Sequence, residues 1–361
     1  MIPSHPINLF EYETLAQKHL SQMAWDYYAS GAWDEVTLKD NCTAFDRYRL
    51  YPRMLVDVSQ RDLSTTILGQ SLSAPILIAP MAFQCLANSA GEVATAKAGT
   101  SLGIGMVLST LATKSMAEVT TANPQTWFQL YIHRDRNLTR ALVEYAYNCG
   151  AKALCVTVDA PLLGKRERDT HNQFVLPTGM ELANLSNLTD LDIPQRQGES
   201  GLFAYFAEQL DPGVTWKDLA WLRSLVPIPL VVKGILRPDD AIRAVEVGAD
   251  AIIISNHGGR QLDGAIATID AIAEIVAAVG DRTEILMDGG IRRGTDILKA
   301  LALGAKAVLI GRPILWGLAV AGETGVQHVI EILRDELSLA MALSGCANLG
   351  DIDRSLVKVK S

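Results

Sequence analysis

The stretch IIISNHGGRQLDG, residues 252–264, joins three isoleucines directly to a segment of polar, ionisable and glycine residues. A short apolar run bounded in this way is typical of a strand that is buried on both faces. Such strands occur mainly in parallel sheets whose two faces are covered by helices. The abrupt change to Ser, Asn, His and Gly indicates that this strand ends in a loop that can carry chemistry.

Eight short apolar runs of this kind occur along the chain. The other seven are APILIAP (74–80), GMVLST (105–110), TWFQLYI (126–132), ALCVTVD (153–159), PLVVKGI (229–235), EILMDGG (284–290) and AVLIGR (307–312). Segments with helical spacing lie between most of them, and several end in the Gly that commonly follows a helix. This alternation predicts an α/β fold with parallel strands and right-handed crossovers. Eight units favour a closed (β/α)8 TIM barrel, with an open doubly wound sheet as the alternative.

Two parts of the chain lie outside the repeat. Residues 1–70 are predicted to form an N-terminal helical extension, in which LAQKHLSQMAWDYYASGA is one helix that ends at Gly31. Residues 160–214 form a long insertion after strand four, rich in Asn, Asp, Gln and Gly. Such a connection is typical of a lid-like loop over a site, with a flexible surface excursion as the alternative. We therefore expect one domain over residues 1–361, with the barrel over 71–361.

Charge and composition argue against several classes of protein. The net charge of −8 argues against a nucleic-acid partner, which usually needs a basic face. The N-terminal sequence lacks the pattern of a secretory signal, and no apolar stretch approaches the ~18 residues of a membrane-spanning helix. The five cysteines contain no CxxC pair, so we expect reduced structural thiols and no metal site. The chain is predicted to be a cytoplasmic protein without a membrane partner.

Polar and ionisable residues follow the end of nearly every predicted strand. In a TIM barrel these ends meet on one face, where the active site lies. In chain order the residues at this face are Pro80, Met81, Ala82, Ser109, Gln129, Tyr131, Thr157, Asp159, Arg166, Lys233, His257, Arg260, Asp288, Gly289, Gly290, Gly311 and Arg312. Their common position predicts one site built from many strands.

Two glycine-rich turns predict where a phosphate binds. MDGGIRRG (287–294) and IGRP (310–313) follow the last two strands and open helices, with Arg292 and Arg312 beside them. Glycines let main-chain N–H groups approach an anion, and a helix N-terminus adds partial positive charge. Barrel enzymes often hold phosphate after strands seven and eight. Because no GxGxxG opens a βαβ unit, a mononucleotide such as FMN is favoured over a Rossmann-bound dinucleotide.

Lys233 interrupts an otherwise apolar strand, and a buried ammonium is costly unless it is paired. It can stabilise the negative charge of a reduced flavin, or form a Schiff base as in aldolases. The third interpretation is a structural lysine that pairs with a carboxylate such as Asp159. The sequence leaves these three open.

His257 is the candidate base of the site, because its side chain exchanges a proton near neutral pH. Asp159, at the end of strand four, is the candidate that orients it. Arg260 and Arg166 offer planar forks suited to a carboxylate. This set suits a substrate that carries a hydroxyl or proton next to a carboxylate.

The stretch SNHGGRQLDG (255–264) resembles the signature of the FMN-dependent 2-hydroxy acid oxidase and dehydrogenase family. The similarity covers nearly the whole chain, and its glycolate oxidase and L-lactate oxidase branches are the most similar. The other matching motifs, in order, are WDYYASGA, APILIAPMA, FQLY, TVDAPLLGKRE, VVKG, MDGGIRRGTD and IGRP. A collinear set of this kind is highly specific, and the barrel of the family agrees with the count of strands.

The resemblance implies a role for each matching residue. His257 is expected to act as the base at the substrate, with Asp159 stabilising its imidazolium form. Arg260 and Arg166 are expected to hold the substrate carboxylate, with hydroxyl contacts from Tyr27 and Tyr131. Lys233 is expected to face the N1 region of the flavin. The remaining cofactor contacts are expected from Ala79, Ala82, Ser109, Gln129, Thr157 and Ser255 around the ring, and from Asp288, Gly290, Arg292, Gly311 and Arg312 at the ribityl phosphate.

One position departs from the glycolate oxidases, which carry tryptophan where this chain has Leu111. Since that position faces the side chain of the substrate, a smaller residue leaves room for a methyl group. We therefore predict a preference for L-lactate, with glycolate also accepted. The alternative is that Met81 and Phe206 close the space and glycolate stays preferred.

The predicted reaction oxidises an L-2-hydroxy acid to the 2-oxo acid and reduces O2 to hydrogen peroxide. The family also implies a homotetramer or homo-octamer. A dehydrogenase that uses another electron acceptor, a Schiff-base aldolase and a non-catalytic barrel are the alternatives.

Overall fold

The computed structural model describes residues 6–186, 188–189, 193–194 and 200–360. Its centre is a closed barrel of eight parallel strands in the order β10-β11-β4-β5-β6-β7-β8-β9. The strands are β4 Ile76–Ile78, β5 Gly105–Ser109, β6 Thr126–Leu130, β7 Leu154–Thr157, β8 Leu230–Ile235, β9 Ala251–Ile254, β10 Glu284–Asp288 and β11 Ala307–Ile310. All eight predicted strands and the closed barrel are confirmed, and the open sheet is excluded.

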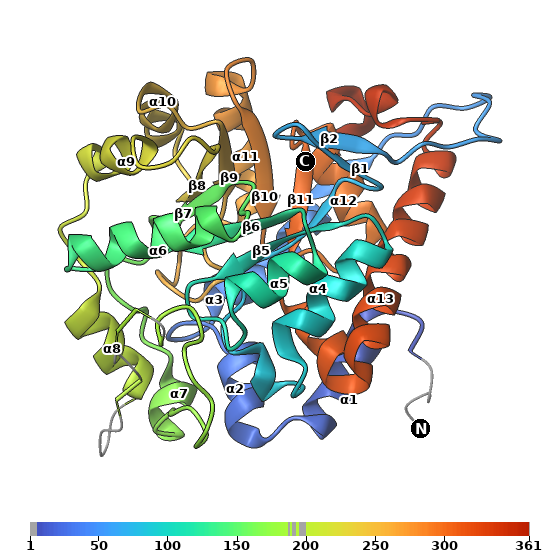
Figure 1. The fold of residues 1–361 in the computed structure, drawn as a ribbon. Coiled ribbons are helices and arrows are strands. Elements are labelled where there is room, and N and C mark those ends of the chain that lie inside the picture. The colour runs from blue at the N-terminus through green and yellow to red at the C-terminus, as the bar shows by residue number, and fades with distance from the viewer. Residues whose placement is uncertain (1–5, 187, 190–192, 195–199, 361) are drawn as a thin grey trace.

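Helices surround the barrel and form its outer layer (Figure 1). They are α4 Gly91–Ser101, α5 Met116–Ala122, α6 Arg136–Asn148, α9 Trp216–Arg223, α10 Pro238–Glu246, α11 Thr268–Val279, α12 Gly294–Ala302 and α13 Arg312–Leu343. The last of these is broken at Ala321 and Gly322, whose backbone angles are not helical. Leu142 of α6 and Ile272 of α11 are completely buried, as the amphipathic spacing of these helices requires.

The N-terminal extension differs from the single long helix that we predicted. The segment forms two helices, α1 Leu9–His19 and α2 Gln22–Ala29, and Leu20 and Ser21 between them have extended backbone. The Ser21 side chain accepts a hydrogen bond from the N–H of Ala24, which makes it the N-cap of the second helix. The second helix ends at Ala29, and Ser30 rather than Gly31 caps it. A third helix, α3 Val36–Thr43, follows.

The extension also contains strands, which the prediction of helices alone missed. β1 Tyr48–Leu50 pairs with β12 Val357–Val359 near the C-terminus, and β2 Thr65–Ile67 pairs with β3 Gln70–Leu72 in a hairpin. Ile67 and Leu72 of the hairpin are buried against the side chains that fill the barrel. The hairpin thus closes the end of the barrel opposite to α2, α7 and α8 (Figure 1).

The insertion at residues 160–214 contains more structure than a flexible excursion. It forms α7 Glu167–His171 and α8 Gly201–Gln209 over the carboxyl ends of the strands. Phe174, Tyr205 and Phe206 are buried, and the Tyr205 hydroxyl lies 3.0 Å from Nε2 of His133. These contacts attach the insertion to the end of β6. Positions 187, 190–192 and 195–199 of the predicted lid lie outside the described residues.

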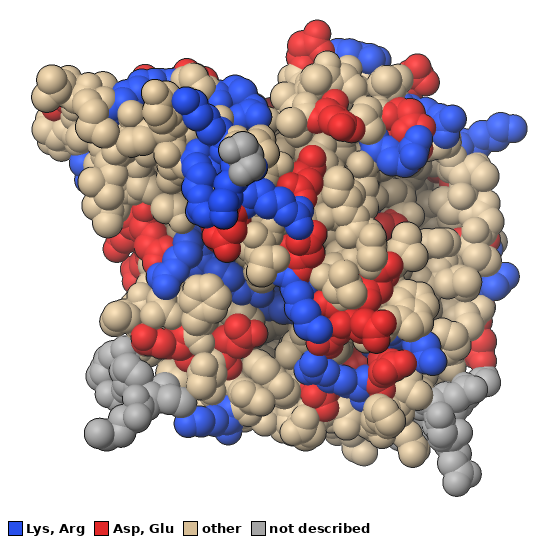
Figure 2. Space-filling view, turned by 180° about the vertical axis from the view of Figure 1, so that it is seen from behind, with Lys and Arg blue, Asp and Glu red and all other residues tan. Residues whose placement is uncertain are grey.

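No helix in the described ranges is long and apolar enough to cross a membrane. All five cysteines are free, and the described residues contain no group of three His, Cys, Asp or Glu side chains that could hold a metal ion. Side chains of both charges are interspersed over the face in Figure 2.

Candidate active site

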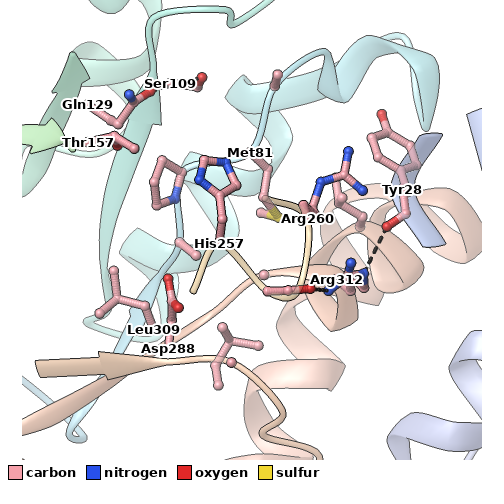
Figure 3. A pocket seen from close by; sticks show the side chains of 18 of the residues that line it. Tyr28, Met81, Ser109, Gln129, Thr157, His257, Arg260, Asp288, Leu309 and Arg312 are labelled. Carbon is pink, nitrogen blue, oxygen red and sulfur yellow. Dashed lines mark hydrogen bonds between the residues drawn. The ribbon is translucent and has the colours of Figure 1, made fainter. Parts of the chain in front are cut away.

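A cavity of about 1050 Å³, counted to its open mouth, lies at the carboxyl ends of the barrel strands. Its walls include nearly all of the predicted site residues, namely Tyr27, Ala79, Pro80, Met81, Ala82, Ser109, Leu111, Gln129, Tyr131, Thr157, Arg166, Lys233, His257, Arg260, Asp288, Gly289, Gly290, Arg292, Gly311 and Arg312. In Figure 3, His257 stands between Ser109, Gln129 and Thr157 on one side and Arg260 and Arg312 on the other.

Two predicted residues stand behind the wall of the cavity. Asp159 contacts the far side of His257, as expected for a residue that orients it. Ser255 was predicted to line the flavin ring but does not line the cavity. It is completely buried, and its hydroxyl accepts hydrogen bonds from Lys233 Nζ at 2.8 Å and from the N–H of His257 at 3.0 Å. Its place in the structure is to hold the lysine and the histidine backbone.

The His257–Asp159 pair has the geometry of a base and its orienting carboxylate. Nδ1 of His257 lies 2.8 Å from Oδ1 of Asp159, which leaves Nε2 directed toward Tyr131, whose hydroxyl is 3.5 Å away. Burial lowers the pKa of His257 below its ordinary value, although Asp159 opposes this shift. Burial alone would raise the pKa of Asp159, but His257 and Lys233 outweigh it and lower that pKa. At neutral pH the pair is therefore a neutral imidazole beside a carboxylate, which is the form that can accept a proton.

The backbone around the histidine explains the HisGlyGly sequence. His257 has a φ of 59°, in the left-handed region that non-glycine residues seldom adopt. The next two residues, Gly258 and Gly259, also have positive φ. A Cβ on Gly258 would lie 2.8 Å from Nη1 of Arg312, and one on Gly259 would lie 2.6 Å from the backbone of Leu38. Only glycines let this turn carry the imidazole while it packs against Arg312 and α3.

Two tyrosines near the histidine are hydrogen-bond donors. Burial raises the pKa of both Tyr27 and Tyr131, so both phenols keep their protons at neutral pH. Tyr27 stacks on Phe174 with ring centres 4.6 Å apart, and the Arg260 guanidinium lies 5.0 Å from its ring centre. These contacts hold its hydroxyl toward the cavity among cationic groups.

Arg166 and Arg260 form a cationic wall beside His257. Nη1 of Arg260 donates to the carbonyl of Ser30 at 2.8 Å, and Nη1 of Arg166 lies 3.9 Å from Oδ2 of Asp169. Burial and the nearby charge of Arg260 lower the pKa of Arg166 to about 10, so it stays positive at neutral pH. Arg166 is buried and Arg260 is half-buried, and two cations so placed are favourable for an anion that enters between them.

Lys233 pairs with Asp288 rather than with Asp159. Its Nζ lies 3.0 Å from Oδ2 of Asp288, and both side chains are nearly buried. Burial acts to lower the pKa of Lys233, but Asp288 and Asp159 outweigh it and raise that pKa. A lysine held in its protonated form is a poor nucleophile, because a Schiff base requires the free amine. The structure therefore favours Lys233 as a fixed positive charge.

A second cationic part of the cavity wall, at Arg312 and Arg292, is suited to a phosphate. The Arg312 guanidinium donates to the carbonyls of Tyr28, Gly258 and Ser30 at 2.9, 3.0 and 3.0 Å, and Figure 3 shows it beside Tyr28. Burial and the like charges of Arg260 and Arg292 lower the pKa of Arg312 to about 9. Within the described ranges, neither Arg312 nor Arg292 forms an ion pair with a carboxylate. An anion is the partner that these two cations lack.

The remaining walls fit a flavin mononucleotide. Gly289 and Gly290 have positive φ, and a Cβ on Gly290 would collide with the carbonyl of Asn41. Among the described residues, the buried Nε2 of Gln129 and Oδ1 of Asp288 have no hydrogen-bond partner. A buried donor such as Nε2 of Gln129 is costly without a partner, and a carbonyl oxygen of the flavin ring would accept its hydrogen bond. A carboxylate repels phosphate, so Asp288 is better suited to a sugar hydroxyl than to the phosphate we assigned to it.

The cavity also has lining residues that the sequence did not single out. They are Tyr28, Leu202, Gly258, Ile291, Leu309, Ile310, Pro313 and Leu315. Tyr28 follows Tyr27 in the WDYYASGA motif, which was a usable signal. Leu202 comes from α8, far from any strand end, and no local pattern marks it.

The family comparison agrees with this site. Residues 16–359 match the family model described as FMN-dependent dehydrogenase. The chain is 66% identical to an L-lactate oxidase from a Nostoc species, covering 98% of both chains, and 52% identical to human 2-hydroxyacid oxidase 1, covering 96% of this chain and 95% of that protein. It is 49% identical to glycolate oxidase from Spinacia oleracea, covering 96% of this chain and 94% of that protein.

Among solved structures, mandelate oxidase with (S)-4-hydroxymandelic acid is similar, with a TM-score of 0.94, 40% identity and coverage of 98% of this chain and 99% of that chain. A TIM barrel whose cavity is lined by a histidine and four arginines is the fold and the kind of site expected of a flavin oxidoreductase. The chain belongs to the FMN-dependent dehydrogenase family. Within that family it is an FMN-dependent 2-hydroxy-acid oxidase.

Proposed function

We propose that this enzyme oxidises L-lactate in preference to glycolate, and that it passes the electrons to O2 to form hydrogen peroxide. The observation that carries the proposal is the position of the His257–Asp159 pair beside Arg166 and Arg260, in a cavity whose wall also carries Arg292 and Arg312. One cavity thus has a place for a carboxylate, a base and a phosphate.

Arg166 and Arg260 bind the carboxylate of the substrate, and the hydroxyls of Tyr27 and Tyr131 donate to its oxygens. These contacts fix the α-carbon of the substrate and its hydroxyl next to Nε2 of His257. The same nitrogen lies 3.5 Å from the Tyr131 hydroxyl. Burial of Arg166 in a site of low polarity strengthens its attraction for the anion.

His257 takes a proton from the substrate as the 2-hydroxy acid becomes a 2-oxo acid. The imidazolium that forms is stabilised by Asp159, whose Oδ1 is 2.8 Å from Nδ1. FMN, when bound, supplies the two-electron acceptor. Lys233 contributes a fixed positive charge at the end of β8, held by Asp288 and Ser255.

The preference for L-lactate rests on Leu111. Its side chain is buried in the cavity wall and is smaller than the tryptophan of glycolate oxidases. Met81 and Phe206 line the same cavity, and the Phe206 ring meets the edge of Tyr131 at 5.2 Å. If these two side chains close the space beside Leu111, glycolate is preferred instead.

Two measurements test the proposal. Peroxide formation from a panel of L-2-hydroxy acids should give a higher kcat/KM for L-lactate than for glycolate, and the reverse order would refute the preference. The variant His257→Gln should retain bound FMN but lose flavin reduction by about 10²–10⁴-fold, as expected for loss of a general base. Retained reduction would refute the role of His257. Substrate oxidation without peroxide would favour a dehydrogenase with another acceptor.

The oligomeric state and the location stay predictions. A homotetramer or homo-octamer is supported by exposed apolar side chains at Met54 and Leu55 and at Leu339 and Leu343 of α13. Light scattering of the purified protein tests the subunit number, and fractionation of the source cells tests the cytoplasmic location.

A further inference from the structure

Glu92 is a completely buried carboxylate that the proposed reaction does not use. It is the second residue of α4 and does not line the active-site cavity. Burying a carboxylate costs free energy unless hydrogen bonds offset the loss of hydration. The hydrogen-bond partners of Glu92 therefore indicate its role.

Those partners come from two different loops. Oε1 of Glu92 accepts from the N–H of Gln84 at 3.1 Å, in the loop after β4. It also accepts from the N–H of Thr113 at 2.9 Å, in the loop after β5. Oε2 accepts from the Thr113 hydroxyl at 2.8 Å, and that hydroxyl in turn accepts from the N–H of Cys85 at 3.0 Å. One carboxylate therefore links the two loops from outside the barrel.

The same loops carry two walls of the cavity. Met81 lies three residues before Gln84, and Leu111 lies two residues before Thr113. Between them the N–H of Phe83 donates to the carbonyl of Leu111 at 3.1 Å. Phe83 has a φ of 57°, an uncommon conformation that its neighbours must hold in place. The hydrogen bonds of Glu92 to Gln84 and Thr113 lie next to this contact in the chain, and they hold the loops on both sides of it.

We propose that Glu92 is a positioning residue that sets the separation of Met81 and Leu111, and through it the choice between L-lactate and glycolate. The inference rests on the proposed function, in which the space beside Leu111, which Met81 can narrow, decides between the two substrates. A purely structural Glu92 would affect stability and both substrates equally. A positioning Glu92 changes the ratio of the two kcat/KM values.

The test uses the FMN-loaded enzyme and two separate variants. Glu92→Gln keeps the shape but removes the negative charge, and Thr113→Val removes the hydroxyl that joins Glu92 to Cys85. The control is Glu118→Gln, because the hydrogen bonds that the Glu118 side chain forms among the described residues stay within the turn at Ser115. For each we measure kcat/KM with L-lactate and glycolate, FMN affinity and thermal unfolding.

Glu92→Gln and Thr113→Val should each lower the L-lactate to glycolate ratio by about tenfold, since small displacements of a substrate wall have large effects. FMN affinity should change by less than about twofold, and the control ratio should stay constant. Should Glu92→Gln fail to fold, Thr113→Val alone decides the outcome.

Three results overturn the inference in different ways. An unchanged ratio in folded variants, while Leu111→Trp does change it, overturns the role of Glu92 alone. A ratio that does not respond to Leu111→Trp overturns the proposed lactate preference, and the inference with it. Equal losses for both substrates together with weaker FMN binding would make Glu92 merely structural.

Discussion

Nδ1 of His257 lies 2.8 Å from Oδ1 of Asp159, although the two residues are 98 positions apart in the chain. The end of β9 and the end of β7 meet across the intervening strand β8, whose Lys233 also lies at this rim. The barrel thus places a neutral base between a carboxylate and a cation.

Asp159→Asn should lower kcat strongly with little change in FMN binding. An amide cannot stabilise the imidazolium that forms when His257 takes a proton, and general-base effects of this kind are about 10²–10⁴-fold. Because Asp159 raises the pKa of His257, its removal should move that pKa further down. Stopped-flow flavin reduction across a pH series checks both effects, and a rate equal to wild type would contradict the pairing.

The pH dependence of the wild-type enzyme should follow the neutral imidazole. The pKa of His257 is lowered below its ordinary value of 6.5, so the base is available above that pKa and protonated below it. kcat/KM should therefore be constant near neutrality and fall as the pH drops through a value below 6.5. A fall already above pH 7 would show that burial does not lower the pKa of His257.

Leu111→Trp should shift the enzyme toward glycolate. Filling the space for one methyl group is worth about 1–3 kcal/mol, which corresponds to roughly 5- to 150-fold in the ratio of kcat/KM values. The measurement is peroxide formation with each acid. Leu111→Ile, which keeps the volume, is the matched control and should leave the ratio nearly unchanged.

Lys233→Met should destabilise the protein as well as slow it. The change leaves Asp288 buried without its cation, and loss of one partner of a buried pair costs about 3–5 kcal/mol. Denaturant unfolding measures this cost. Lys306→Met is the control, because its pair with Glu284 is partly exposed and worth about 0–1 kcal/mol. Equal losses in the two variants would contradict a buried pair.

Arg312→Lys should weaken FMN binding by about tenfold or more. Lysine keeps the charge but cannot reproduce the three hydrogen bonds to the carbonyls of Tyr28, Gly258 and Ser30. Flavin fluorescence on dilution measures the affinity. Arg293→Lys is a matched control, since Arg293 pairs with Glu336 and does not line the cavity. Equal affinity in Arg312→Lys and wild type would place the phosphate elsewhere.

The sequence was sufficient for the barrel because its strands are buried on both faces and therefore appear as continuous apolar runs. The hairpin of β2 and β3 was missed, since each of its strands has only three residues and TTILGQSL carries no long apolar run. The break between α1 and α2 depends on the cap at Ser21, which lies inside an apparently continuous helical pattern.

The site was predictable where chemistry coincides with a strand end, as at His257 and Lys233. The site was less predictable from the sequence where one polar residue positions another. The partner of Lys233 is Asp288 rather than Asp159, and Ser255 supports the lysine instead of lining the cavity. Such pairings depend on distances across the barrel, which spacing along the chain does not contain.

The placement of these groups determines how enzymes on this scaffold can diverge. Lys233 lies within β8, and the contact between His257 and Asp159 joins the connections after β9 and β7, so each of these residues depends on another part of the barrel. Met81 and Leu111 lie on the connections after β4 and β5 and take no part in that contact. Lineages can therefore acquire new hydroxy acids by exchanging a few loop side chains while they inherit the proton transfer intact.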